Sequence, residues 1–466
     1  MKKNKNITRT RTVSDSMGKV KVPKNALYGA QTQRAINNFP ISDLQFTNDF
    51  IYSVVIIKRS AAIINYNLKS LNKKQKDSIV KACDEILKGN YDNQFPVDVY
   101  QTGSGTSTNM NCNEVIATIA NTFTKSKSNF IHPNDHVNLG QSSNDVIPTA
   151  IHISSLKMVE EKLLPALQSL EKSLLDKSSK FKDIIKIGRT HLQDATPMTV
   201  GQEFSGYKEI ISKNIKRINI NKSFLCSLAQ GGTAIGTGIN THKNFGEKIA
   251  EEISRITQIE FIETKNHFES QSSQDSIVGF SGDLKTLAVG LSKIANDIRW
   301  LASGPRSGLG ELIIPSIQPG SSIMPGKVNP VMCESLIQVC AQVIANDSAI
   351  TLGGLGSIFE LNLMLPLIAN NILCSIKTLS NAVNAFNTNL IEGLEVNIEK
   401  CKNYIEGSLA MCTSLAPIIG YDKAAEIAYE AYKKNKSIRE VAKEKKIMTD
   451  SKLDKLLDPQ TMIKPK

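Results

Sequence analysis

A stripe of apolar residues with helical spacing constrains the fold of this chain more than any other sequence feature. Its members are Leu284, Leu287, Leu291, Ile294, Ile298 and Leu301. The intervals alternate between three and four residues, which places all of them on one face of an α-helix. A helix this long with one continuous apolar face must bury that face against partner helices.

Three further segments carry the same kind of pattern. They are Leu156, Val159, Leu163, Leu167, Leu170 and Leu174, then Ile368, Ile372, Ile376, Leu379, Val383 and Phe386, and more weakly Leu336, Cys340 and Val343 after Pro330. We expect Asn144 and Asp145 to cap the first of these helices and Pro165 to kink it. Because few strand-like alternations separate the segments, the sequence predicts a mainly α fold with an elongated central bundle of long helices.

The length and the distribution of these patterns predict several domains. At 466 residues the chain exceeds a single typical hydrophobic core, so two or three domains are expected. Residues 1–141 mix short helices with turns, residues 142–400 hold the long helices, and residues 401–466 form a smaller helical tail. We therefore predict three mainly helical domains with these boundaries.

Composition excludes several classes of function. The net charge of +12 comes from scattered lysines without an aromatic-interleaved basic stripe, so we expect no nucleic-acid partner. The eight cysteines form no CxxC pair and indicate buried thiols in a reducing compartment. No run approaches the roughly 18 consecutive apolar residues of a membrane span, and the N-terminus lacks an apolar signal region. These features predict a cytoplasmic protein with no membrane partner.

The loop at residues 320–330, GSSIMPGKVNP, is where we expect the chemistry. Its glycines and prolines exclude a helix interior, and Ser321, Ser322, Lys327 and Asn329 supply anion-binding groups at short spacing. A phosphate-binding P-loop is excluded because five residues separate the glycines and Val328 follows the lysine. An ordinary surface loop is the alternative interpretation.

Three other polar segments interrupt the hydrophobic patterning. They are TGSGTSTNMN at residues 102–111, GQSSND at 140–145 and GRTHLQDATP at 188–197. The glycines of the first allow close approach of backbone N–H groups to an anion, and the second leads into a helix whose N-terminus favours a carboxylate, although a plain helix cap is equally compatible. In the third, His191 is a candidate acid or base, with a structural histidine as the alternative and Glu334 as an orienting partner if the fold brings the two together.

The segment His132-Pro133-Asn134-Asp135-His136 has some features of a metal site, because two histidines flank an aspartate. However, the proline and asparagine favour a turn, and no further ligand cluster lies nearby in the sequence. We therefore expect neither a metal ion nor another cofactor.

Together with LAQGGTAIGTGIN at residues 228–240, these segments resemble class II fumarate hydratases over nearly the whole chain. The loop at 320–330 marks only the wider fumarase and aspartase superfamily, and His191 narrows the resemblance because aspartases usually carry glutamine there. The resemblance implies the three-domain fumarase/aspartase-like fold in an iron-independent homotetramer, with a core built from bundle helices of four subunits and active sites shared among three chains. It also implies reversible anti hydration of fumarate to L-malate, a step of the tricarboxylic acid cycle, through an aci-carboxylate intermediate.

The resemblance assigns a role to individual residues. Ser321 corresponds to the base that takes a proton from C3 of malate, and His191 with Glu334 corresponds to the pair that handles the water. The substrate-binding positions are Ser104, Gly105, Thr106, Ser142, Ser143, Asn144, Thr190, Ser322, Lys327, Val328 and Asn329. A second, non-catalytic dicarboxylate site corresponds to His132, Pro133, Asn134 and Asp135.

Three segments depart from the family pattern, and the sequence leaves two other functions open. The departures are residues 139–140, 267–271 and 417–418, and none of them removes a catalytic residue. The alternatives are an aspartate ammonia-lyase, for which His191 is unexpected, and a non-catalytic helical-bundle protein, which would not need an intact set of Ser321, His191 and Lys327.

A serine base requires cationic, water-poor surroundings, so we expect Gly320 and Gly326 to permit closure of the loop at residues 320–330 over the substrate.

Overall fold

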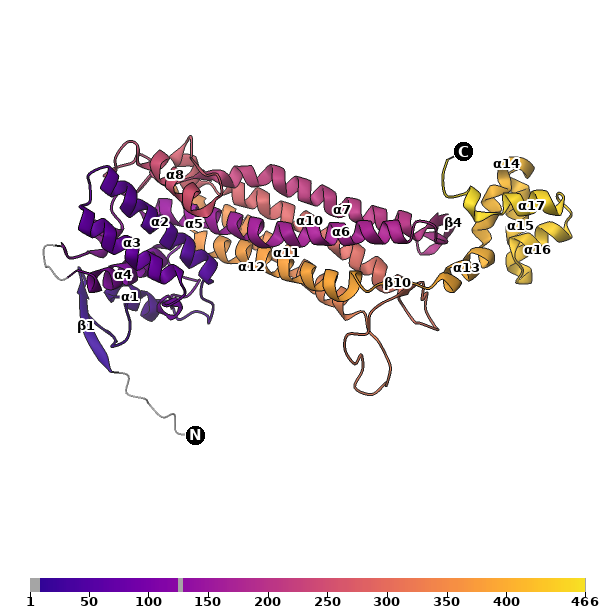
Figure 1. The fold of residues 1–466 in the computed structure, drawn as a ribbon, viewed down its shortest axis with the longest axis horizontal. Helices are drawn as coiled ribbons and strands as arrows, with labels where there is room; N and C mark the ends of the chain where they lie inside the picture. The colour runs from indigo at the N-terminus through magenta and orange to yellow at the C-terminus, as the bar shows by residue number, and fades with distance from the viewer. Residues whose placement is uncertain (1–8, 125–128, 466) are drawn as a thin grey trace. The chain divides into compact units, whose positions relative to one another are not determined.

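The structure is a computed structural model that describes residues 9–124 and 129–465, and it is mainly helical (Figure 1). The α-helices are α1 (Ala30–Asn38), α2 (Asn48–Asn67), α3 (Lys73–Leu87), α4 (Thr106–Thr122), α5 (Ser143–Met158), α6 (Leu164–Lys180), α7 (Val200–Asn221), α8 (Phe245–Thr257), α9 (His267–Ser272), α10 (Asp275–Leu301), α11 (Val331–Gly354), α12 (Leu365–Phe386), α13 (Ile398–Gly407), α14 (Ala416–Ile419), α15 (Tyr421–Lys434), α16 (Ile438–Glu444) and α17 (Asp450–Leu456). Single 3-10 or π-helical segments are η1 (Asp92–Gln94), η3 (Pro133–Val137), η4 (Val159–Leu163), η5 (Lys222–Cys226), η6 (Asn387–Ile391), η7 (Leu409–Ser414) and η8 (Pro459–Thr461).

The strands are short and pair two by two. They are β1 (Thr10–Asp15) with β2 (Gly18–Pro23), β3 (Ile185–Thr190) with β4 (Gln193–Thr199), β5 (Ser227–Leu228) with β6 (Ile262–Glu263), β7 (Leu312–Ile313) with β10 (Glu395–Val396), and β8 (Ser357–Ile358) with β9 (Leu361–Asn362). Only the β5–β6 pair among these is parallel. The mainly α fold predicted from the helical stripes is therefore correct.

The chain divides into two compact units that interleave along the sequence. The first comprises residues 1–164, 216–286 and 342–379, and the second comprises residues 165–215, 287–341 and 380–466. Helices α7, α10, α11 and α12 each contribute residues to both units. The division into domains 1–141, 142–400 and 401–466 stays a prediction.

Helix α2 lies at the centre of the first unit, where it packs against α3, α5 and α8. Phe50, Val54, Ile57 and Ala61 on this helix are fully buried. The expectation of short helices before residue 141 was wrong for α2 and α4, which are 20 and 17 residues long. Both are buried on most of their faces, so their sequences lack the one-sided stripe that reveals a half-buried helix.

The apolar stripe of α10 is buried along its whole length, as its spacing predicts. In the second unit, α10 packs so closely on α7 that a Cβ atom at Gly290 would lie 2.7 Å from Ile210 Cγ2. In the first unit, the hydroxyl of Ser281 on α10 donates a 2.8 Å hydrogen bond to Asp347 on α11. Each unit therefore contains its own packed section of the long helices.

The helix predicted across residues 144–174 is present as α5, η4 and α6. The π-helical segment η4 ends one residue before Leu164, so the regular hydrogen bonding changes directly ahead of Pro165, whose ring and missing N–H disfavour an unbroken α-helix. The predicted cap needs correction. Ser142 is the N-cap, and Asp145 completes a capping box with it, while Asn144 lies inside the helix.

The C-terminal helices of the second unit enclose a small core of their own. Its members include Ile405, Met411, Leu415, Ile427 and Val441. The same core contains Ile187 of β3, so the β3–β4 hairpin rests on the C-terminal helices. This contact places the segment that carries His191.

All eight cysteines are free thiols, and five of them are buried as expected. Cys226, Cys374 and Cys412 are partly exposed, which corrects the expectation that all were buried. Among the described helices, none combines the length and the apolar character that crossing a bilayer requires.

The buried His152 on α5 predicts an acid-sensitive fold. Burial lowers its pKa from 6.5 to about 4, and its Nδ1 lies 2.9 Å from the carbonyl oxygen of Ser227. Between these pH values the unfolded chain takes up a proton that the folded chain excludes, so stability falls as the pH drops from 6.5 towards 4. In the wild type, we expect the free energy of unfolding to fall by on the order of 2 kcal/mol between pH 7 and pH 5 because of this histidine. The substitution His152→Gln should abolish that decrease, and urea unfolding at the two pH values measures it. The exposed His242→Gln is the control, and equal acid losses in the wild type and His152→Gln would contradict the prediction.

Candidate active site

The N-termini of α4 and α5 bring together three hydroxyl groups in the first unit. Ser104 Oγ and Thr106 Oγ1 share a 2.7 Å hydrogen bond, and Thr106 Oγ1 shares another of 2.7 Å with Ser143 Oγ. Gly105 caps α4 with a φ of 70°, and a Cβ atom there would lie 2.9 Å from Ile147 Cγ1. Two helix N-termini that converge on a hydroxyl cluster form a favourable environment for a carboxylate.

Asp145 connects the start of α5 to the loop at residues 229–241. Its Oδ1 accepts a 2.9 Å hydrogen bond from the Ser142 backbone, and its Oδ2 accepts bonds of 3.2 and 2.9 Å from the backbone N–H groups of Gly231 and Thr233. Burial raises the pKa of Asp145 to about 6, although these N–H groups oppose the shift. The neighbouring Asn144 donates a 2.7 Å hydrogen bond to the Ala234 carbonyl, so the loop and the helix start are held as one piece.

A buried lysine that the sequence reasoning missed supports the same region. Lys58 on α2 is fully buried, and its Nζ donates hydrogen bonds of 2.8 Å to Asn138 Oδ1 and 3.1 Å to Gln141 Oε1. Burial lowers its pKa to about 7, and the nearby Asp145 carboxylate opposes this shift. Lys58 therefore fixes the segment that leads into Ser142. The available sequence signal was that Lys58 directly follows the apolar run at residues 54–57 within a helical segment.

The residues matched to a second dicarboxylate site form one π-helical turn, η3. His132 caps this turn, and its Nδ1 accepts hydrogen bonds of 3.3 and 3.2 Å from the backbone of Asn134 and Asp135. Pro133 occupies the first position of this helical segment, whereas the sequence led us to expect a turn without helix. In the described part of the chain, no group of three or more His, Cys, Asp or Glu residues is placed to hold a metal ion.

The loop at residues 320–330 closes on itself in the second unit. Ser321 Oγ accepts hydrogen bonds from the backbone N–H groups of Ile323, at 3.3 Å, and Met324, at 3.0 Å. The Asn329 side chain donates to the carbonyl oxygen of Gly320, where a Cβ atom would lie only 1.8 Å from the Lys327 carbonyl oxygen. Residues 316–321 and 324–328 surround a hollow of about 400 Å³. Two backbone donors aimed at one hydroxyl oxygen favour negative charge on that oxygen.

His191 stands at the tip of the β3–β4 hairpin, which the sequence reasoning did not predict. Thr190 pairs with Gln193, so His191 and Leu192 form the two-residue turn, with φ values of 57° and 60°. The polar turn expected beside His191 is therefore made by His191 itself. His191 lines a cavity of about 670 Å³ together with Tyr207 and Trp300.

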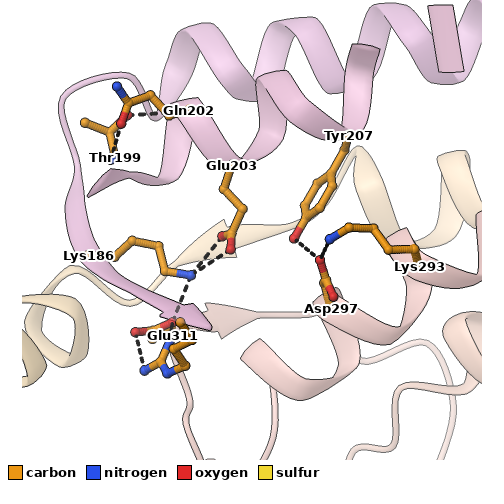
Figure 2. A network of polar contacts seen from close by, with 9 residues as sticks. Lys186, Thr199, Gln202, Glu203, Tyr207, Lys293, Asp297 and Glu311 are labelled. Atoms are coloured by element: carbon orange, nitrogen blue, oxygen red, sulfur yellow. Dashed lines mark hydrogen bonds and ion pairs between the residues drawn. The ribbon is translucent and has the colours of Figure 1, made fainter. Parts of the chain in front are cut away.

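A network of ion pairs anchors strand β3 of this hairpin (Figure 2). Arg189 donates hydrogen bonds of 2.8 and 2.9 Å to the two carboxylate oxygens of Glu311. Lys186 lies 3.2 Å from the same carboxylate and 2.9 Å from Glu203 on α7. No sequence motif marks Glu311 or Glu203, because their partners lie far away in the sequence.

The expected pair of His191 and Glu334 is not joined within this chain. In the described residues, no hydrogen bond or ion pair connects the two side chains. Glu334 is exposed in the first turn of α11, where its backbone N–H donates a 3.1 Å hydrogen bond to the Pro330 carbonyl. The hydroxyl cluster belongs to the first unit, whereas His191, Ser321, Lys327 and Glu334 belong to the second. One joint site built from these residues stays a prediction.

Sequence comparison finds close relatives along nearly the whole chain. A family profile described as lyase matches residues 18–345, and one described as fumarase C C-terminus matches residues 411–464. The chain is 49% identical to the class II fumarate hydratase of Wigglesworthia glossinidia brevipalpis over 97% of this chain and 98% of the relative. It is 48% identical to that of Nitrosomonas europaea over 96% of this chain and 98% of the relative.

Solved structures agree with the sequence comparison. The class II fumarase of Schistosoma mansoni superposes with a TM-score of 0.95 at 40% identity and covers 97% of this chain and 99% of its own. A Brucella melitensis protein described as fumarate lyase:delta crystallin bound to cobalt superposes with a TM-score of 0.93 at 42% identity and covers 98% of this chain and all of its own. This chain belongs to the class II fumarate hydratase family.

Proposed function

We propose that this protein catalyses the reversible hydration of fumarate to L-malate. Support comes from relatives named class II fumarate hydratase that match it from end to end. The observation that carries the proposal is the environment of Ser321. Its Oγ receives two backbone N–H donors at 3.3 and 3.0 Å in a loop that also carries Lys327 and Asn329. These donors suit a serine that must act as a base through its alkoxide.

The proposed reaction removes a very weakly acidic proton. Ser321 takes the proton from C3 of malate, and the electrons that this leaves form a dianionic aci-carboxylate. The ammonium of Lys327 and the amide of Asn329 stabilise the charge as it develops. Collapse of the intermediate breaks the bond between C2 and its hydroxyl group, which leaves on the opposite face as water after His191, with Glu334, supplies a proton. Hydration of fumarate follows the same steps in reverse.

The other substrate-binding assignments follow from the same reaction. The cluster of Ser104, Thr106 and Ser143 at two helix N-termini suits the substrate carboxylate that does not react. Gly105, Ser142, Asn144, Thr190, Ser322 and Val328 are assigned to binding by their match to the family. Residues 132–135 are assigned to a second dicarboxylate site in the same way.

We also propose a homotetramer whose active sites each draw on three chains. Large apolar side chains are exposed on the long helices, including Ile220 on α7, Val289 and Trp300 on α10 and Leu352 on α11. Such exposure is typical of a surface that a partner covers. A shared site also explains why His191 and Glu334 need not meet within one chain. Light scattering of the purified protein measures the number of subunits in the assembly. The cytoplasmic location of the protein stays a prediction.

A direct assay tests the proposed activity. Purified, chelator-treated protein is offered L-malate and, separately, L-aspartate, and the absorbance of the fumarate double bond is followed. We expect absorbance to rise with malate alone, since His191 replaces the glutamine usual in aspartases. A rise with aspartate alone would assign an ammonia-lyase, and no rise with either substrate would favour a non-catalytic protein.

A further inference from the structure

Glu311 is a buried carboxylate that holds two cations from one strand. Its side chain is 1% exposed, and it accepts both hydrogen bonds of the Arg189 guanidinium. The Nζ atom of Lys186 lies 3.2 Å from the same carboxylate (Figure 2). The backbone of Glu311 is also held by hydrogen bonds on both sides. The Glu311 N–H donates a 2.8 Å bond to the Leu301 carbonyl, and its own carbonyl accepts a 2.8 Å bond from Asn397. Glu311 is therefore a fixed point against which β3 is positioned.

The tip of the hairpin has few contacts of its own. Leu192 is 74% exposed, and Thr190, His191 and Gln193 are exposed as well. In the described part of the chain, the ring of His191 makes no hydrogen bond. His191 and Leu192 also hold positive φ angles that are costly for residues other than glycine. Within one chain, the position of His191 is therefore set by the strands that lead to it.

The anchors of those strands lie directly beneath the tip. Arg189 is two residues before His191, and its two parallel hydrogen bonds fix the orientation of the guanidinium as well as its distance from Glu311. Its guanidinium also lies 5.6 Å from the centre of the Tyr404 ring. Lys186, at the other end of the strand, is buried and links Glu311 to Glu203 on α7. One carboxylate thus secures both ends of β3.

We propose that Glu311 is a positioning residue for His191, acting through Arg189 and Lys186. The proposal rests on the role of His191 as the acid and base of the proposed reaction. Glu311 is buried and pairs with the cations of β3, so its effect is to hold the imidazole in line with the departing water. A small displacement of a catalytic group is enough to slow a reaction by orders of magnitude.

The substitution Glu311→Gln tests this role with almost no change in size. The amide carries no charge and can accept only one of the two guanidinium hydrogen bonds. We expect kcat for malate to fall by about 10- to 100-fold with little change in KM, because the displaced histidine affects the transition state rather than substrate binding. The matched control is Glu395→Gln on the neighbouring β10. That glutamate pairs with Lys180 at the surface, where the two side chains are 52% and 54% exposed, and its loss should leave kcat unchanged.

A double-mutant cycle separates positioning from general structural damage. In a His191→Asn background, Glu311→Gln is expected to reduce kcat by less than about twofold, because the group that it positions is already absent. An equal loss in both backgrounds, or an unchanged kcat in the wild-type background, would overturn the proposal. If Glu311→Gln does not fold, Arg189→Lys keeps the charge but removes the two-pronged contact, and the same cycle applies. A wild-type enzyme inactive towards malate and fumarate would instead refute the proposed function.

Discussion

Replacing Ser321 with alanine is expected to lower kcat for malate dehydration by about 1,000-fold or more. The proton on C3 is too weakly acidic for water to remove at a useful rate, and Ser321 is the group whose oxygen receives two backbone N–H donors in this loop. The alanine variant keeps the glycines and Asn329 that shape the loop, so KM should change much less than kcat. Steady-state kinetics in both directions measure both constants. The values of kcat/KM for malate and for fumarate should fall by the same factor, because a substitution in the enzyme does not change the equilibrium between the two.

The control for this substitution lies four residues before the loop. Ser316 lines the same hollow as Ser321 but has no assigned role, so Ser316→Ala should retain nearly full activity. A Ser321→Ala enzyme with near-normal turnover would assign the base to another residue.

Replacing Lys327 with glutamine is expected to lower kcat by about 100- to 1,000-fold. The intermediate carries one more negative charge than malate, and a cation placed beside that charge stabilises the transition state more than the substrate. Glutamine retains a hydrogen-bond donor of similar length, so the loss measures the charge itself. Complete saturation curves for malate give kcat and KM of the wild type and of Lys327→Gln for comparison.

The comparison for Lys327 is a lysine outside the site. Lys180 on α6 pairs with Glu395 at the surface, and Lys180→Gln should leave kcat and KM unchanged. If Lys327→Gln raised only KM, its ammonium would bind substrate and transition state equally, and the stabilising charge would have to come from elsewhere.

The glycine-rich loops of the candidate site could be predicted because they depend on local requirements of the backbone. Gly105 and Gly326 have φ values of 70° and 78°, and Gly320 leaves no space for a side chain. Only glycine fits these positions without strain, so glycines within polar segments reveal the loops in the sequence. The stripe of α10 is visible for a similar reason, since one face of a helix recurs at a fixed spacing.

The remaining features depended on partners that lie far away in the sequence. The β3–β4 hairpin has no strong strand signal, and its position relies on an ion pair between residues 122 positions apart, Arg189 and Glu311. Lys58 was missed because its acceptors, Asn138 and Gln141, are more than 75 positions away. Helix α2 was underestimated because it is buried on most sides and therefore carries no one-sided pattern.

The sequence by itself determined the helical class, the glycine positions and the residues available for chemistry. Periodicity and allowed φ angles are properties of a residue and its near neighbours, so they can be read along the chain. The tertiary structure alone decided that the Asp145 carboxylate would accept hydrogen bonds from the backbone N–H groups of residues 231 and 233. It also decided that Glu311 would anchor the strand leading to His191. A buried charge is tolerated only where the fold brings its partners within hydrogen-bonding distance, and that condition depends on packing between distant segments.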